Sequence, residues 1–285
     1  MSRLNTPLIR RRSADISSTL QRTALPEVLK TIYAGRGITD PADLTLTLDQ
    51  LIPPSTLKGI GEAAELLADA MEGEARVVVV GDFDADGATS CAMAVSVLRQ
   101  MGLKEVAYLV PNRFEFGYGL TPEIVELAAA QMPDLIVTVD NGISSIEGVS
   151  AAQALGMSVL VTDHHLPAAT LPTADVIVNP NQPGCRFPSK SLAGVGVIFY
   201  VLSALRAELC QQDWFTSQGL EMHRLSDALE VVALGNVADV VPFDRNNRVF
   251  VAAGLVRNRS GRARPQIGAP FEGARTHHLP PHEPD

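Results

Sequence analysis

The sequence predicts an α/β protein built on a parallel, Rossmann-like sheet with helices on both faces. Short apolar runs alternate with stretches of helical periodicity, which is the pattern of parallel sheets joined by right-handed crossovers. The predicted strand at 76–81, for example, contains four consecutive valines, as is typical of strands buried on both faces. Hydrophobic residues make up 46% of the 285-residue chain and charged residues only 19%, so a globular protein with a sizeable core is expected.

The order of the elements divides the chain into three parts. Strands are expected at 76–81, 106–110, 135–139, 158–162 and, as a shorter fifth strand, 176–178. Helices are expected at 61–72, 88–101, 191–210, 222–235 and 245–257. Two further helices are expected between them, one that begins at Thr121 and one that follows Asn141-Gly142 and ends near Gly156. Thr121 is the expected N-cap, because proline, here Pro122, suits the first position of a helix. The main α/β domain, with helical segments at its C-terminal end, is therefore predicted at 61–257.

The two ends of the chain differ from this middle part. Residues 1–60 are polar and interrupted by prolines, which predicts an N-terminal segment of short helices. Residues 258–285 are rich in proline and histidine and have little apolar periodicity, so a disordered tail unrelated to the rest is expected there.

Composition also bears on the location and the partners of the protein. The three cysteines form no CxxC pair, which argues against a zinc-thiolate site or a disulfide framework and favours the cytoplasm. The longest apolar run, 192–205, falls short of the roughly 20 residues that span a bilayer, so we expect a buried helix and no membrane association. The net charge of −9 argues against nucleic-acid binding, unless the acidic residues gather around metal ions that reverse the local field.

Four polar segments carry the candidate chemistry. GDFDADG (81–87), VDNG (139–142) and TDHH (162–165) each follow a predicted strand, and GNVADV (235–240) ends a predicted helix. Taken singly, each could be an ordinary turn. Functional groups of a parallel sheet gather beyond the carboxyl ends of its strands, however, and carboxylates that close together cannot all ionise unaided. Divalent cations would resolve this repulsion.

Two other motifs can be tested on the same residues. The spacing of Asp82, Asp84 and Asp86 matches the start of a calcium-binding EF-hand loop, but the twelfth position is Met93 instead of glutamate. No GxxxxGK[ST] sequence occurs, which excludes a P-loop nucleotidase. Carboxylates with imidazole and no thiolate favour Mn²⁺ or Mg²⁺ over zinc, and the number of ligands suits two ions about 4 Å apart.

The four segments resemble the motifs of the DHH phosphoesterase superfamily, whose name comes from the third motif. Three flanking stretches resemble its RecJ-type single-strand-specific exonucleases: PNRFEFGYGL (111–120), LAGVGV (192–197) and NVADVVPFDRNNR (236–248). The likeness runs from about residue 8 to about residue 257 and narrows the expected domain to a DHH phosphoesterase domain.

The resemblance implies roles for individual residues. Metal ligands would be Asp82, Asp84, Asp86, Asp140, His164 and Asp239. His165 would face the scissile phosphate and stabilise charge or donate a proton, and Asp163 would orient a histidine. Arg113 would contact a phosphate, unless it forms a surface salt bridge, and Tyr118 could stack on a base. Gly194 and Gly196 are interpreted as sites of close helix packing.

The implied activity is metal-dependent 5′-to-3′ hydrolysis of single-stranded DNA in DNA repair and recombination. RecJ-type enzymes continue into a second substrate-binding domain and an OB-fold, neither of which is expected within these 285 residues, and contacts with single-strand-binding protein or a helicase would need those parts. Three alternatives remain at this stage. The chain could be another DHH phosphoesterase acting on short oligonucleotides, cyclic dinucleotides or pyrophosphate, a metal-free interaction module, or a truncated product with weak catalysis.

Overall fold

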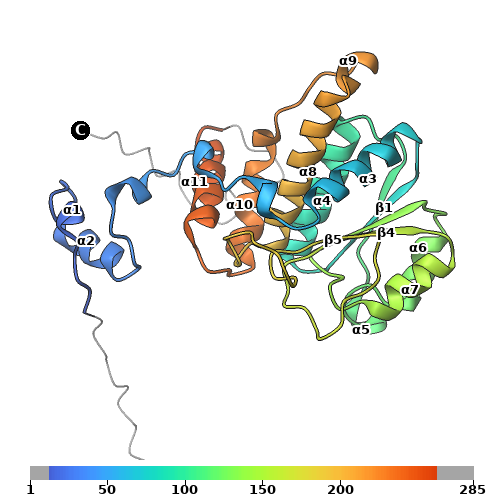
Figure 1. Cartoon of the computed structure of the whole chain (residues 1–285), viewed down its shortest axis with the longest axis horizontal. Helices are drawn as coiled ribbons and strands as arrows, with labels where there is room; N and C mark the ends of the chain where they lie inside the picture. The colour runs from blue at the N-terminus through green and yellow to red at the C-terminus, as the bar shows by residue number, and fades with distance from the viewer. Residues whose placement is uncertain (1–12, 262–285) are drawn as a thin grey trace, which may run out of the picture. The chain divides into compact units, whose positions relative to one another are not determined.

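The computed structural model describes residues 13–261 (Figure 1). The chain forms two compact units, one up to Leu46 and one from Thr47 onward, so residues 47–60 of the predicted N-terminal segment belong to the second unit. The predicted tail begins at residue 258, but helix α11 (Arg245–Arg259) extends two residues into it. The rest of that tail, residues 262–285, lies outside the described residues.

The first unit consists of short helices, as its proline-interrupted sequence predicts. It contains α1 (Ser18–Gln21), α2 (Glu27–Ala34) and the 3₁₀ turn η1 (Pro41–Leu44). The side chain of Ser17 caps α1 by accepting a hydrogen bond from the amide of Leu20. The buried Lys30 ammonium bridges the two helices, because it donates to the carboxylate of Glu27 at 2.8 Å and to the carbonyl of Gln21 at 3.0 Å.

A five-stranded parallel sheet in the order β2-β1-β3-β4-β5 forms the centre of the second unit. The strands are β1 (Val77–Gly81), β2 (Val106–Leu109), β3 (Leu135–Val139), β4 (Ser158–Thr162) and β5 (Val176–Val178). All five predicted strands are confirmed. Every residue of β1 and β3 is buried, which explains why both strands are apolar except for Thr138 in β3.

Helices cover both faces of the sheet, as predicted (Figure 1). On one face, α3 (Ile60–Glu72), α4 (Ala85–Gln100) and α8 (Gly194–Gln211) pack on side chains such as Val77 and Val79. On the other, α6 (Pro122–Ala129) and α7 (Ile146–Ala154) pack on Val78 and Val80. Successive side chains of β1 therefore enter two different hydrophobic cores. Thr121 caps α6 as expected, accepting from the amide of Ile124.

Two helices next to the acidic segments differ from their predicted bounds. α4 begins at Ala85 rather than at residue 88, because the carboxylate of Asp84 accepts a hydrogen bond from the amide of Gly87 and caps the helix early. The stretch predicted as one helix at 222–235 is instead a 3₁₀ turn, η4 (Leu225–Ala228), followed by α10 (Leu229–Ala238). The remaining short elements are η2 (Leu48–Gln50), η3 (Pro54–Thr56), α5 (Arg113–Phe116) and α9 (Trp214–Ser217).

Helix α8 is the apolar helix predicted for the core. Among the described residues it is the single helix long and apolar enough to cross a membrane by length and composition. This is weak evidence for a membrane-spanning helix, because 61% of its 18 residues are buried inside the fold and the core helices of soluble proteins meet the same test. α8 packs against α3, α4 and the sheet, and its side chains join the larger hydrophobic core.

Candidate metal centre

Three of the acidic segments leave the sheet side by side. In the register of the parallel strands, the last residue of β1 pairs with the last residue of β3, and that residue pairs with the last residue of β4. The next residue along each chain segment is an aspartate: Asp82, Asp140 and Asp163. The sheet alone therefore brings three carboxylates to one edge.

The first segment presents three carboxylates at the start of α4. Asp82 is buried, and its Oδ1 accepts a hydrogen bond from the amide of Phe83 at 2.8 Å. Asp84, the exposed N-cap of α4, accepts from the amide of Gly87 at 2.9 Å. Asp86 lies in the first helical turn and is only 1% exposed.

The second segment holds Asp140 in an unusual backbone conformation. Its φ of +62° lies in the left-handed region, which non-glycine residues rarely adopt and which is common at functional sites. The neighbouring Asn141 fixes this turn, since its Nδ2 donates to the carbonyls of Val80 at 3.1 Å and Val139 at 2.9 Å. The Oγ1 of Thr138 in turn donates to the carbonyl of Asn141 at 2.7 Å. Asp140 is thereby held with its side chain almost fully buried.

In the third segment, the buried Asp163 organises both histidines. Its Oδ1 accepts from the amides of His164 at 2.7 Å and His165 at 3.1 Å, and it lies 2.7 Å from Nδ1 of His165. Its Oδ2 accepts from the amide of Ile143 at 2.9 Å. These are the contacts expected of a residue that orients a histidine, and the histidine concerned is His165.

Two asparagines after β5 support the same segment from behind. The Nδ2 of Asn181 donates to the carbonyl of His164 at 2.6 Å, and that of Asn179 donates to the carbonyl of His165 at 3.0 Å. The sequence interpretation did not include these asparagines. Their signal was the short polar stretch NPN at 179–181 directly after the fifth strand, the same position that the acidic segments occupy.

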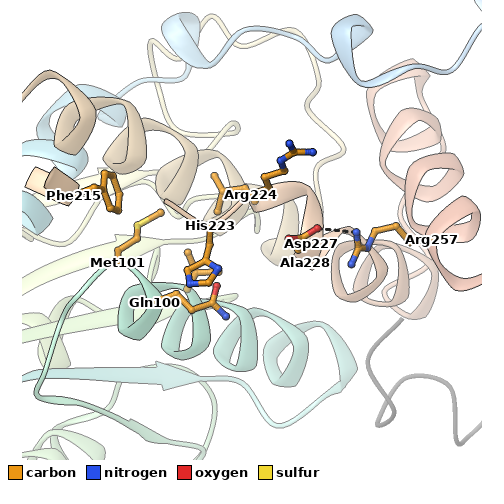
Figure 2. Close-up of a pocket in the computed structure, with 10 residues that line it drawn as sticks. Gln100, Met101, Phe215, His223, Arg224, Asp227, Ala228 and Arg257 are labelled. Carbon is orange, nitrogen blue, oxygen red and sulfur yellow. Dashed lines mark hydrogen bonds and ion pairs between the residues drawn. The ribbon is translucent and has the colours of Figure 1, made fainter. Parts of the chain in front are cut away.

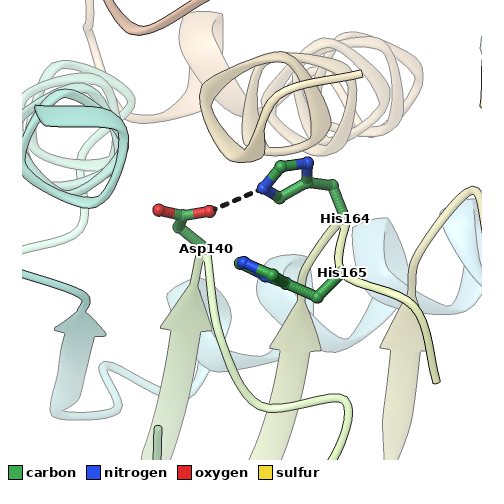
Figure 3. A group of neighbouring side chains, drawn as sticks. All are labelled: Asp140, His164 and His165. Carbon is green, nitrogen blue, oxygen red and sulfur yellow. Dashed lines mark ion pairs between the residues drawn. The ribbon is translucent and has the colours of Figure 1, made fainter. Parts of the chain in front are cut away.

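His164 is the point at which the segments meet. Its Nε2 lies 3.1 Å from Oδ1 of Asp140, 3.7 Å from Oδ2 of Asp239 and 3.9 Å from Oδ2 of Asp86. Figure 3 shows Asp140 at the tip of one strand and His164 on the loop of its neighbour, facing each other across the edge of the sheet. Asp239, the C-cap of α10, reaches the site from outside the sheet. The predicted convergence of the fourth segment with the other three is thus observed.

The ligand atoms fall into three overlapping groups, within each of which they lie no more than 4.8 Å apart. The groups are Asp82 with Asp84 and Asp140, Asp86 with His164 and Asp239, and Asp140 with His164 and His165. Asp140 belongs to two groups and lies beside the third, because its Oδ1 is 3.1 Å from Nε2 of His164. Such an arrangement suits two cations that share one carboxylate.

The electrostatics of the site call for positive charge. Burial, together with the nearby carboxylates of Asp86 and Asp84, raises the pKa of Asp140 to about 10. Burial also raises the pKa of Asp86 to about 6 and that of Asp239 above its ordinary value. Among the described side chains, the ion pairs of Asp86, Asp140 and Asp239 are all with His164, with neither lysine nor arginine taking part. A bound cation would supply the missing charge.

Two buried atoms at the centre of the site also fit a metal ion. Oδ1 of Asp140 and Nε2 of His164 are both shielded from solvent and have no hydrogen-bond partner among the described residues. Buried polar atoms are normally satisfied, so such a pair indicates a ligand. The donors are carboxylate oxygens and one or two imidazole nitrogens, which suit Mn²⁺ or Mg²⁺.

His165 and Tyr118 flank this cluster on its more open side. The hydrogen bond with Asp163 raises the pKa of His165, whose side chain is 43% exposed. Burial alone would raise the pKa of Asp163, but the hydrogen bond and charge of His165, together with the hydrogen bonds from the amides of Ile143 and His165, outweigh burial, so the pKa of Asp163 lies below its ordinary value. The hydroxyl of Tyr118 donates to the carbonyl of Asp140 at 3.3 Å and lies 3.2 Å from the ring nitrogens of His165. Arg113 is the first residue of α5.

A pocket of about 370 Å³ lies at the opposite end of α4 (Figure 2). Gln100 and Met101 line it, whereas Asp86 lies 14 residues earlier, about 21 Å away by the rise of a helix. The guanidinium of Arg257 there pairs with Asp227 at 2.8 Å and with the buried Glu230 at 3.0 Å. This pocket is therefore separate from the candidate metal centre, and these two carboxylates have a cation within the protein.

A parallel α/β sheet with acidic and histidine motifs at its carboxyl edge defines a class of phosphoesterase, and comparison with known proteins agrees. Residues 76–235 match the sequence model of the DHH family, N-terminal domain. The chain therefore belongs to the DHH family.

Several curated relatives are single-stranded-DNA-specific exonucleases named RecJ. The chain is 54% identical to that of Dickeya dadantii over 249 residues, which cover 87% of this chain and 43% of the relative. It is 50% identical to that of Escherichia coli over 266 residues, which cover 93% of this chain and 46% of the relative. The chain thus spans less than half the length of these relatives.

Solved structures agree with this similarity. A crystal structure of exonuclease RecJ bound to manganese has a TM-score of 0.66 and 33% identity, covering 78% of this chain and 53% of that one. RecJ of Thermus thermophilus in complex with Mn²⁺ has a TM-score of 0.68 and 29% identity, covering 90% of this chain and 35% of that one.

Proposed function

We propose that this chain binds two divalent cations, Mn²⁺ or Mg²⁺, and hydrolyses single-stranded DNA from its 5′ end. The observation that carries the proposal is a pair of buried atoms, Oδ1 of Asp140 and Nε2 of His164, which lie 3.1 Å apart inside a cluster of carboxylates and have no hydrogen-bond partner among the described residues. One cation would be held by Asp82, Asp84 and Asp140, and the other by Asp86, His164 and Asp239, with Asp140 beside both. Bound there, the cations would supply Lewis-acid stabilisation of the charge that develops on the phosphate oxygens.

His165 would act on the leaving group. Asp163 holds its Nδ1 at 2.7 Å, which fixes the ring so that the other nitrogen can donate a proton to the leaving oxygen. The exposed fraction of His165, 43%, leaves room for a substrate phosphate, whereas the 12% exposure of His164 suits a ligand. Arg113, at the start of the helix after β2, would bind a neighbouring phosphate of the strand.

Single-stranded DNA is proposed as the substrate because the relatives named above are single-stranded-DNA-specific exonucleases. Exposed apolar side chains flank the acidic segments and could receive unstacked bases: Phe83, Phe114, Tyr118 and Leu166. Residues 61–257 would form the catalytic domain of a DNA repair and recombination enzyme that works in the cytoplasm. Single-strand-binding protein or a helicase would be further partners through regions found in the longer relatives.

A metal titration followed by a nuclease assay tests the proposal. Chelator-treated protein should bind two Mn²⁺ ions by isothermal titration calorimetry and then release mononucleotides from a single strand in the 5′-to-3′ direction. Duplex DNA of the same sequence should stay intact. Absence of Mn²⁺ binding, or release from the 3′ end, would contradict it.

Substrate length distinguishes the proposal from the alternative of a phosphoesterase for short substrates. Dinucleotides and cyclic dinucleotides should be tested beside single strands of increasing length. Tight binding of a single strand needs a basic and aromatic surface, and this chain has a net charge of −9. Little binding energy is therefore expected from remote nucleotides, so shortening the strand should lower kcat/KM less than for a full-length relative. Hydrolysis of cyclic dinucleotides in preference to every single strand would favour the alternative.

A further inference from the structure

The first turn of α8 lies between two of the proposed metal ligands. The amide of Gly194 donates to Oδ2 of Asp86 at 2.6 Å, and the amide of Val195 donates to Oδ1 of the same carboxylate at 3.0 Å. Both oxygens of Asp86 are thus held by the N-terminal amides of a helix, which favour negative charge. Asp86 belongs to α4, so the contact ties two helices together at the metal centre.

The same turn of α8 also packs closely against the side chain of Asp140. A Cβ atom built on Gly194 would lie 2.6 Å from Oδ1, 2.7 Å from Cβ and 2.9 Å from Cγ of Asp140. All three contacts are shorter than real Cβ atoms show, so Asp140 can occupy its place only while residue 194 has no side chain. Asp140 cannot easily retreat, because Asn141 pins its left-handed turn to β1 and β3.

Gly235 on α10 packs in a similarly close way against Asp86, the other ligand beside this turn. A Cβ atom there would lie 2.8 Å from Oδ1 of Asp86, and also 2.5 Å from Oγ1 of Thr89 and 2.7 Å from Cγ1 of Val195. The next turn of α10 ends at Asp239, whose amide donates to the carbonyl of Gly235 at 2.9 Å. The close approach that Gly235 permits therefore also determines how near Asp239 comes to Asp86.

The first turn of α8 is itself fixed from outside. The hydroxyl of Ser189 donates to Oδ2 of Asp244 at 2.6 Å, and Nδ2 of Asn247 donates to the carbonyls of Ser191 and Pro242. These bonds fasten the segment before α8 to the start of α11 and to the turn after Asp239. The first turn of α8 therefore has little freedom to move when a side chain is added to Gly194 or Gly235.

We propose that Gly194 and Gly235 are positioning residues that set the spacing of the two metal ions. Gly194 determines the place of Asp140, the carboxylate beside both ions, and Gly235 determines the place of Asp86 relative to Asp239. The inference rests on the proposed function, since it requires that these carboxylates bind cations. It also revises the interpretation of Gly194 from the sequence, because the packing that this glycine permits is against a carboxylate rather than only between helices.

Gly194→Ala tests the inference by metal binding. The added methyl should displace Asp140 and weaken Mn²⁺ binding at both sites by about 10- to 100-fold, the range found when groups that orient metal ligands are lost. Titration calorimetry gives affinity and stoichiometry, and electron paramagnetic resonance of the Mn²⁺-loaded full chain should show weaker coupling between the ions. Gly235→Ala should mainly lower the affinity for the ion that Asp86, His164 and Asp239 would hold.

Gly196→Ala is the matched control in the same helical turn. The three atoms nearest to its Cβ would all belong to the side chain of Leu192, the closest at 3.1 Å, so this change should leave Mn²⁺ binding as in the wild type. If Gly194→Ala does not fold, as judged by its thermal melt, Gly235→Ala answers the question, because its clash is with a different ligand. Wild-type protein that binds no Mn²⁺ would reject the proposed function. Two Mn²⁺ ions bound with wild-type affinity and coupling by folded Gly194→Ala or Gly235→Ala would overturn only this inference.

Discussion

Buried carboxylates lie near both ends of α4, but their negative charge is compensated differently at each end. At its N-terminal end, Asp86 and Asp140 are buried together, and the one described side chain with which they form ion pairs is His164. Arg257, which lines the pocket at the C-terminal end of α4, neutralises the buried Glu230 within the protein. Buried carboxylates that the chain neutralises itself support the fold, whereas those it leaves without a cation indicate a place for an external one.

Replacing Asp140 with asparagine should produce the largest effect. The proposed shared ligand would lose its charge with almost no change in shape, so Mn²⁺-dependent hydrolysis should fall by at least about 10³-fold. A nuclease assay on single strands measures this. Asp227→Asn, the matched change at the other end of α4, should keep kcat/KM within about twofold. Asp140→Asn with more than a tenth of wild-type activity would end the two-ion interpretation.

Replacing Arg257 with methionine should reverse the pattern, with a loss of stability and no loss of metal binding. Glu230 is only 3% exposed and would be left buried without its guanidinium partner, a change that costs about 3 kcal/mol. Urea unfolding measures the free energy, and Arg259→Met, in the same last turn but exposed, is the control. Equal stability of the two variants would show that the ion pair contributes little, and the contrast between the ends of α4 would fail.

His165→Ala should separate proton transfer from metal binding within the metal centre. Loss of the proposed proton donor should lower kcat by about 10²-fold, while Mn²⁺ affinity, carried by the buried carboxylates and His164, should change little. Single-turnover kinetics and calorimetry provide the two measurements. His223→Ala in the remote pocket is the matched control, for which wild-type kcat is expected. A large loss of Mn²⁺ affinity in His165→Ala would reassign this histidine as a ligand.

Tyr118→Phe should have the smallest effect of the series. The hydroxyl makes one hydrogen bond to the carbonyl of Asp140 and lies near His165, and a neutral hydrogen bond contributes only about 0.5–1.5 kcal/mol. A decrease in kcat/KM of less than about tenfold is therefore expected, with Tyr108→Phe on β2, 63% exposed, as control. A decrease as large as that of His165→Ala would give the hydroxyl a direct role in the reaction.

The sequence by itself determined the fold class, the five strands and the positions of the acidic segments. Strands buried on both faces must be apolar throughout, and a polar motif directly after each one marks the functional edge of a parallel sheet. These signals are local, so they can be read without knowing the fold. The early start of α4 differs from the predicted bounds, although its signal is also local, because Asp84 is both a candidate metal ligand and the N-cap of the helix.

Only the tertiary structure decided what surrounds those carboxylates. Asp239 and His164 lie 75 residues apart in the chain, and nothing in either segment states that Oδ2 and Nε2 approach to 3.7 Å. The role of Gly194 was equally hidden, since a glycine at the start of an apolar helix predicts close packing but does not say against what. Periodicity reports the neighbours along one element, whereas the charge and spacing of a metal centre depend on groups that folding brings together from separate elements.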